Sequence, residues 1–134
     1  MQFVRNGPDV PERLLQAHED GRVVFFCGAG NSYPAGLPSF QGLVKRVFAE
    51  LGETPNAVQK AAIKARQYDT AIGLLEGTVV GRRETVRRAL VGILEPDLSS
   101  PAAIETHDAL LTLGTNREGC TRLITTNFDR LFEE

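Results

Sequence analysis

The stretch "VVFFCGAGNSYPAGLPSF", residues 23–40, decides how the rest of this sequence is interpreted. A run of large apolar residues ends at Gly28-Ala29-Gly30, and small residues, a tyrosine and two prolines follow before Ser39. The length and the Val and Phe content of residues 22–27 predict a strand buried on both faces, as in a parallel sheet. Glycines after such a strand let the backbone turn tightly or approach another molecule without a Cβ in the way.

The composition is that of an ordinary single domain. The 134 residues are 42% apolar and 24% charged, and the net charge of −2 gives no reason to expect nucleic acid or an anionic membrane as a partner. The two cysteines, Cys27 and Cys120, form no CxxC pair, so neither a zinc site nor a disulfide framework is expected. No signal peptide and no apolar run of about 20 residues is present, which favours a cytoplasmic location.

Most of the remaining sequence has helical periodicity. Ser39 is predicted to cap a helix that ends before Gly52, and a second strand is predicted over residues 121–126 because they are rich in β-branched side chains. The helix over 102–113 is predicted to bury its large apolar residues, namely Ile104, Leu110, Leu111 and Leu113. The helix after Ser39 is predicted over residues 40–51, and the other helices over 11–20, 55–68, 68–77, 82–94 and from 130 onward.

The sequence closes soon after the second predicted strand, with "RLFEE" as the first turn of a helix. Two strands form a sheet of little independent stability, so we expect residues 1–134 to be the N-terminal part of a longer protein. Within it we expect three segments: 22–53 with the first strand and glycine loop, a helical insertion over 54–100, and 101–134 with the second strand.

Polar residues follow both predicted strands. Ligands of open α/β folds bind beyond the carboxyl ends of parallel strands, where "GAGNS" (28–32) and "TTNFD" (125–129) lie. Free backbone N–H groups in the first segment could hold a nucleotide phosphate, although a lone GAG triplet is also a common tight turn. Asn127 and Asp129 have structural explanations too, because Asn forms Asx-turns and carboxylates favour helix N-termini.

Four dispersed segments in order resemble a known family. They are "GAGNS", "AGLPSF", "HDALLTL" and "LITTNFDRLFEE", and together they are similar to the SIR2-like (sirtuin-related) domains of bacterial anti-phage defence proteins. The resemblance spans residues 20–134, the first part of the family's domain. It implies an α/β fold: a Rossmann-like parallel sheet of the sirtuin type, which binds NAD, with an inserted helical subdomain.

The resemblance also implies roles for individual residues. Asn127 would hold the nicotinamide ribose and is the predicted catalytic residue, while residues 34–38 would form a flap over the nicotinamide end. No metal ligand is predicted. The predicted NAD-binding residues are Gly28, Ala29, Gly30, Ser32, Pro38, Phe40, Thr126, Asn127 and Asp129.

The activity implied is hydrolysis of NAD, as substrate, to nicotinamide and ADP-ribose, in bacterial anti-phage defence by NAD depletion. Two alternatives stay open: an NAD-dependent protein deacylase, and a non-catalytic module for NAD or ADP-ribose binding or for oligomerisation. A homo-oligomer or further defence-system domains are the expected partners. Sirtuins have Asp and Arg where this chain has Ser39 and Gln41, a departure that disfavours the deacylase.

The family's catalytic histidine is expected after residue 134. His18 is predicted to be a surface residue, and His107 a packed or hydrogen-bonded helix residue, so neither is assigned to catalysis. We therefore expect residues 1–134 by themselves to be inactive or nearly so.

Overall fold

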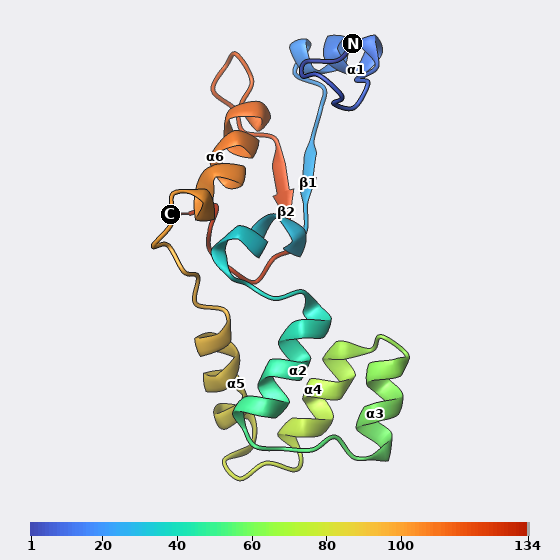
Figure 1. The fold of residues 1–134 in the computed structure, drawn as a ribbon, viewed down its shortest axis with the longest axis vertical. Helices are drawn as coiled ribbons and strands as arrows, with labels where there is room; N and C mark the ends of the chain where they lie inside the picture. The colour runs from blue at the N-terminus through green and yellow to red at the C-terminus, as the bar shows by residue number, and fades with distance from the viewer. Residues whose placement is uncertain (134) are drawn as a thin grey trace.

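The computed structural model describes residues 1–133, without the side chain of residue 82, and shows an elongated molecule in three parts (Figure 1). A short helix lies at one end, a small parallel sheet with its covering helix lies in the middle, and four helices pack together at the other end. The elements are α1 (Glu12–Glu19), β1 (Phe25–Cys27), the 3-10 helix η1 (Ala29–Ala35), α2 (Phe40–Glu50), α3 (Ala57–Lys64), α4 (Tyr68–Glu76), α5 (Arg82–Ile93), α6 (Ala102–Gly114) and β2 (Leu123–Thr125).

The predicted Rossmann-like fold is wrong for the described residues. Within 1–133 the structure is mostly helical, and its sheet has two strands, β1 and β2, rather than the several strands of a Rossmann-type sheet. The reason is visible in the chain between the two strands, where the apolar residues recur at helical spacing and form one 3-10 helix and five α-helices. The predicted helices of this region are confirmed, and so is the parallel pairing of the two strands.

The sheet is covered on one face. Phe25 pairs with Leu123 and Cys27 with Thr125, and α6 packs against this pair so closely that a Cβ on Gly114 would lie 3.7 Å from a ring carbon of Phe25. The opposite face is open: the side chains of Val24, Phe26 and Ile124 are 52%, 72% and 50% exposed. The prediction of a strand buried on both faces is therefore wrong, because helix α6 covers only the face on which Phe25 and Cys27 lie.

Helix α6 buries two small residues and a histidine rather than its leucines. Ala103, His107 and Gly114 are buried, whereas Leu113, predicted as a core residue, is 49% exposed. The other three predicted core residues, Ile104, Leu110 and Leu111, are half-buried. The small side chains of Ala103 and Gly114 let the helix approach η1 and the strands closely.

Helices α2 to α5 form a bundle with its own core (Figure 1). The helix cap predicted at Ser39 is confirmed, since its Oγ accepts a hydrogen bond from the backbone N–H of Gly42 at 3.2 Å. A capping box of Asn56 and Gln59 begins α3. The buried core residues of the bundle are Leu43, Val44, Val47, Phe48, Ala62, Ala71, Leu75, Val79 and Val86.

The glycine-rich stretch is more ordered than the sequence indicates. Ala29–Ala35 form the 3-10 helix η1, which buries Ser32 and Ala35. Gly36 ends it with φ +77, the left-handed conformation that favours glycine, and the N–H of Leu37 bonds the carbonyl of Ser32 at 3.3 Å. The helix directs the chain from the end of β1 toward the bundle (Figure 1).

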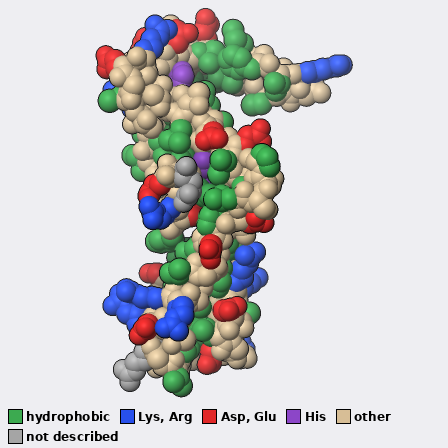
Figure 2. Space-filling view, turned by 90° about the vertical axis from the view of Figure 1, so that its left-hand side faces the viewer, with side chains coloured by type: hydrophobic (Ala, Val, Ile, Leu, Met, Phe, Trp, Pro, Cys, Tyr) green, Lys and Arg blue, Asp and Glu red, His purple; other side chains and the backbone are tan. Residues whose placement is uncertain are grey.

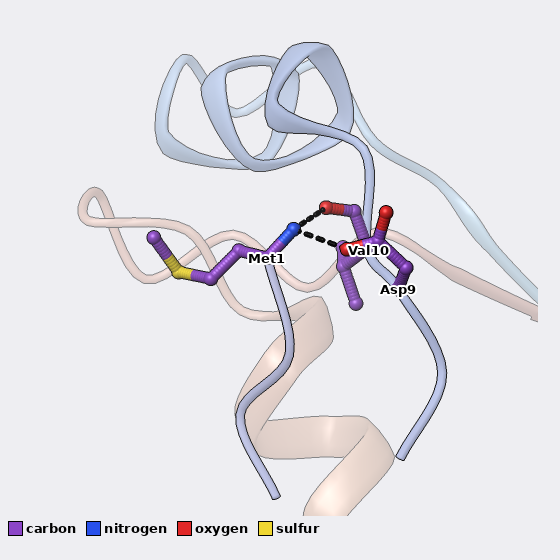
Figure 3. A network of polar contacts seen from close by, with 3 residues as sticks. All are labelled: Met1, Asp9 and Val10. Carbon is purple, nitrogen blue, oxygen red and sulfur yellow. Dashed lines mark hydrogen bonds and ion pairs between the residues drawn. The ribbon is translucent and has the colours of Figure 1, made fainter. Parts of the chain in front are cut away.

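The N-terminal segment folds back on itself. The ammonium group of Met1 donates to the carboxylate of Asp9 and to the carbonyl oxygen of Val10, so that residues 1–10 form a closed loop before α1 (Figure 3). Helix α1 contains no buried residue, and its contact with the body includes His18, whose Nε2 lies 2.7 Å from the carbonyl oxygen of Leu113.

The C-terminal segment differs from its prediction. Residues 131–133 form a turn rather than the start of a helix, and residue 134 lies outside the described residues. Leu131 is buried in a small core with Ala35, Leu37 and Ala103, and Phe132 packs on the ring of His107. Tertiary packing thus fixes this segment without a helix. No helix within residues 1–133 has the length and apolar character to cross a membrane.

Candidate functional site

The two segments that follow the strands lie side by side. The N–H of Thr126 continues the parallel ladder with a bond to the carbonyl of Cys27 at 3.1 Å, and η1 begins two residues after Cys27. The sheet therefore brings residues 29–32 and 126–129 together at its carboxyl end (Figure 1).

A chain of three side chains joins these segments. The amide Nδ2 of Asn127 donates to the hydroxyl of Ser32 at 3.1 Å, and that hydroxyl donates to the Oδ2 of Asp129 at 2.8 Å. Ser32 is 1% exposed, whereas Asn127 and Asp129 are half-buried. The serine hydroxyl is thus used as both acceptor and donor, which fixes the amide of Asn127 with its nitrogen toward Ser32.

An Asx-turn and a helix N-terminus were the structural explanations for Asn127 and Asp129, and they account for part of the observed hydrogen bonding. The other oxygen of Asp129, Oδ1, accepts from the N–H of Leu131 at 3.2 Å, which is an Asx-turn. The backbone N–H of Asn127 donates a hydrogen bond to the Thr125 hydroxyl oxygen at 3.1 Å. No helix follows Asp129 within the described residues, so Asp129 is not at a helix N-terminus there. The side-chain oxygen Oδ1 of Asn127 accepts no hydrogen bond from residues 1–133.

A cleft of about 180 Å³ opens over this hydrogen-bonded chain. It contains seven of the nine residues predicted to bind NAD: Ala29, Ser32, Pro38, Phe40, Thr126, Asn127 and Asp129. Its lining also includes Leu37, which belongs to the predicted flap over residues 34–38, and three residues that we did not predict: Leu43, Leu94 and Phe128. Phe128 lies inside a quoted motif and could have been found there, while Leu43 and Leu94 reach the cleft only through the packing of the bundle.

Phe40 and Phe128 form an aromatic wall of the cleft. The ring of Phe40 lies 6.0 Å from the ring of Phe128 and 5.4 Å from that of Tyr68, centroid to centroid. Phe128 is 71% exposed and Phe40 40% exposed. A flat ligand ring can therefore reach the aromatic surface of Phe128 without any rearrangement.

The other two predicted residues, Gly28 and Gly30, do not line the cleft. Gly28 lies between β1 and η1 and Gly30 in the first turn of η1, and a Cβ on either would meet no atom within 4 Å. Gly28 has φ −119 and ψ −179, an extended conformation that any residue adopts. Neither packing nor backbone conformation therefore requires glycine at position 28, and the space that a side chain there would occupy is empty of protein atoms.

Both histidines lie away from the cleft. His18 is at the opposite end of the strands, beside Leu113, and its ring meets Phe25 edge-on at 6.2 Å. His107 is 1% exposed, and neither ring nitrogen has a hydrogen-bond partner among the described residues. The prediction that His107 is packed is confirmed, and His18 is half-buried rather than a free surface residue.

Cys27 ends β1 directly before the glycine turn. Burial raises the pKa of its thiol above the ordinary value, and a hydrogen bond with Asn31 opposes that shift. A thiol with a raised pKa is a poor nucleophile at neutral pH, so Cys27 serves the packing of the strand. Among the described residues no three His, Cys, Asp or Glu side chains form a group that could hold a metal ion.

Comparison with known proteins gives one relative. The chain is 38% identical over 135 residues to an uncharacterized protein of Sinorhizobium fredii (strain NBRC 101917 / NGR234), y4cA. The alignment covers 99% of this chain but 11% of the length of that relative, whose name states no activity. No family model and no solved structure matches the chain.

Proposed function

We propose that this protein hydrolyses NAD. Water would replace nicotinamide at the C1 carbon of the ribose, so that NAD⁺ and water give nicotinamide, ADP-ribose and a proton. The proposal draws on the resemblance of "GAGNS", "AGLPSF" and "TTNFD" to SIR2-like domains of bacterial defence proteins. In that setting the reaction would deplete NAD in the cytoplasm of an infected cell.

One observation carries the proposal: Ser32, Asn127 and Asp129 form one hydrogen-bonded chain inside a cleft. Ser32 is 95 positions from Asn127 and 97 positions from Asp129 in the sequence. A turn needs no such connection between distant segments. The remaining walls of the cleft include apolar and aromatic side chains, so the polar groups gather on one side. Pockets of this kind, mostly apolar with a few convergent polar groups, are typical of small-molecule sites.

The chemistry of the reaction suits these polar groups. Cleavage of the bond between nicotinamide and ribose develops positive charge on the sugar, as in other glycosidic bonds that break through an oxocarbenium-like transition state. Asn127 Oδ1 is a carbonyl oxygen held in place by the bond from Nδ2 to Ser32, and Asp129 adds a carboxylate next to it. Fixed dipoles and charges of this sign stabilise such a transition state at little cost in reorganisation.

The glycine turn would accept the other half of the substrate. At Gly28 and Gly30 an added Cβ would meet no protein atom, so this part of the backbone is open to a ligand. In the proposed complex, the ADP part of NAD lies along Gly28, Ala29 and Gly30, and the nicotinamide ring reaches toward Phe40 and Phe128. A larger side chain at either glycine would then clash with the substrate rather than with the protein.

The test is nicotinamide release from NAD by the longest native form of the protein, measured by liquid chromatography with no acylated peptide present. Asn127→Ala is expected to reduce the rate at least a hundredfold, because it removes the acceptor for the developing charge. Gln16→Ala is the matched control: it also deletes an amide, but on α1 at the other end of the molecule, and is expected to leave the rate unchanged.

Each outcome separates the proposal from its alternatives. Release that is lost in Asn127→Ala alone supports hydrolysis in this cleft. Release that needs an acylated peptide points to a deacylase instead, and NAD binding without any release points to a binding module. A native protein that neither binds nor cleaves NAD overturns the proposal.

A further inference from the structure

A second hollow, of about 640 Å³, shares Phe40 with the cleft. It is formed by the start of α2, the outer face of α3 and the turn before α4. Phe40 and Tyr68 line it, together with three cationic side chains: Lys60, Lys64 and Arg66.

The charge of this hollow is uniform. Its lining contains no carboxylate, and none of the ion pairs found within residues 1–133 involves one of its three cations. Lys60 and Lys64 are one helical turn apart on α3, where like charges destabilise a helix slightly. The chain as a whole carries a net charge of −2, so this local excess of positive charge is not a general property of its surface.

Arg66 occupies the position after the C-cap of α3, where the backbone conformation favours glycine. It follows Ala65, the last residue of the α3 cap, and has φ +60, a left-handed conformation that side chains other than Gly and Asn rarely adopt. The N–H of the next residue, Gln67, bonds the carbonyl of Ala62 at 2.9 Å, which closes the helix in the manner of a Schellman motif. An arginine here costs stability and adds the third positive charge of the hollow.

We propose that this hollow is a binding site for a nucleoside phosphate. Lys60, Lys64 and Arg66 would hold the phosphate groups, and the aromatic surface of Phe40 and Tyr68 would contact the base. The phosphate and the flat ring of one nucleotide match the two chemistries that the hollow combines. Nucleotide binding here goes beyond the proposed hydrolysis of NAD and does not depend on it, although Phe40 lines both the hollow and the cleft.

Calorimetric titration of the native protein with ADP, at about 0.15 M ionic strength, tests the site. We expect saturable binding that inorganic phosphate competes away. Two variants are expected to weaken it at least tenfold: the double change Lys60→Glu with Lys64→Glu, and Arg66→Gly. Because Arg66→Gly also relieves the positive φ, it is expected to raise the melting temperature, which separates loss of binding from loss of folding.

Two controls complete the design. Arg83→Glu with Arg87→Glu makes the same charge change on α5, outside the hollow, and is expected to keep ADP binding within twofold of the native protein. Gln16→Ala, on α1 and outside both the hollow and the cleft, is also expected to keep it. The proposal is overturned if ADP does not bind saturably, or if either control loses binding as the hollow variants do. It is also overturned if adenosine binds as well as ADP, because the phosphates would then contribute nothing. Tighter binding of a single-stranded oligonucleotide than of ADP at these residues would overturn it as well.

Discussion

The two parts of this molecule that hold the cleft between them are built in different ways. The bundle of α2 to α5 encloses a continuous core in which helices close in sequence pack on one another. The sheet part, made of β1, η1, β2 and α6, has a smaller core and leaves one face of its strands open, with Phe26 72% exposed. Its contacts join residues about a hundred positions apart, as in the bond from Ser32 to Asp129.

Because of this difference, we expect the bundle to be the more stable part and the sheet part, which carries the candidate site, to be the less stable one. The bundle has the larger of the two cores, formed where its helices pack on one another. On the face drawn in Figure 2, Lys and Arg side chains gather over this lower part. The sheet part must close a long loop before its contacts form, which costs chain entropy. The polar residues of the candidate site lie in the sheet part, so we expect the site to open more easily than the bundle unfolds.

The largest expected effect tests the two cores. Leu75→Ala, at a side chain with no exposure in the bundle, is expected to lower the free energy of unfolding by about 2–5 kcal/mol. Leu131→Ala, in the small core of the sheet part, is expected to cost about 2 kcal/mol because fewer buried neighbours surround it. Urea titration followed by circular dichroism measures both. Equal losses would contradict the difference between the two cores.

A second test compares two serines. Ser32→Ala leaves Asn127 Nδ2 and Asp129 Oδ2 without their partner, at a cost of about 1–3 kcal/mol. Ser39→Ala removes a local helix cap in the bundle, at a cost of about 1 kcal/mol. In hydrogen exchange, Ser32→Ala should speed exchange in both strands and Ser39→Ala in α2. If Ser32→Ala left the strands protected, the bond chain would not hold the sheet part together.

A smaller effect is expected at His107. Both ring nitrogens are buried without a hydrogen-bond partner among the described residues, so His107→Leu should keep or raise the melting temperature while retaining the contact with Phe132. His18→Leu, the matched change in the other histidine, breaks the bond to Leu113 and should lower the melting temperature slightly. A marked decrease for His107→Leu would reveal a polar partner of its ring.

The smallest effect concerns the two cysteines. Cys27 is buried and Cys120 exposed, so iodoacetamide should modify Cys120 first. Burial raises the pKa of Cys27 in the folded state above its unfolded value. Its contribution to stability is therefore fully present below about pH 8.5 and is lost as the pH rises toward the raised folded pKa. Cys27→Ala should flatten that alkaline loss, and an unchanged pH profile would show that the thiol does not titrate differently in the two states.

The sequence predicted the helices because each is specified by neighbours within a few positions. Apolar spacing indicated α2 to α5, and Ser39 and Gly52 marked where α2 begins and ends. The motifs at the two strand ends also pointed to residues that the structure brings together, since the parallel pairing of β1 and β2 aligns those ends. What was determined this way is local conformation and the identity of the polar residues at the cleft.

Tertiary structure decided the rest. Which face of β1 is buried depends on where α6 packs, and α6 approaches through Ala103, His107 and Gly114 rather than through its leucines. The extent of the sheet, the aromatic wall at Phe40 and the order of residues 29–35 likewise depend on contacts between distant segments. A periodic pattern reports that a residue is apolar, but burial is a property of the surfaces that meet, and those are set only when the chain has folded.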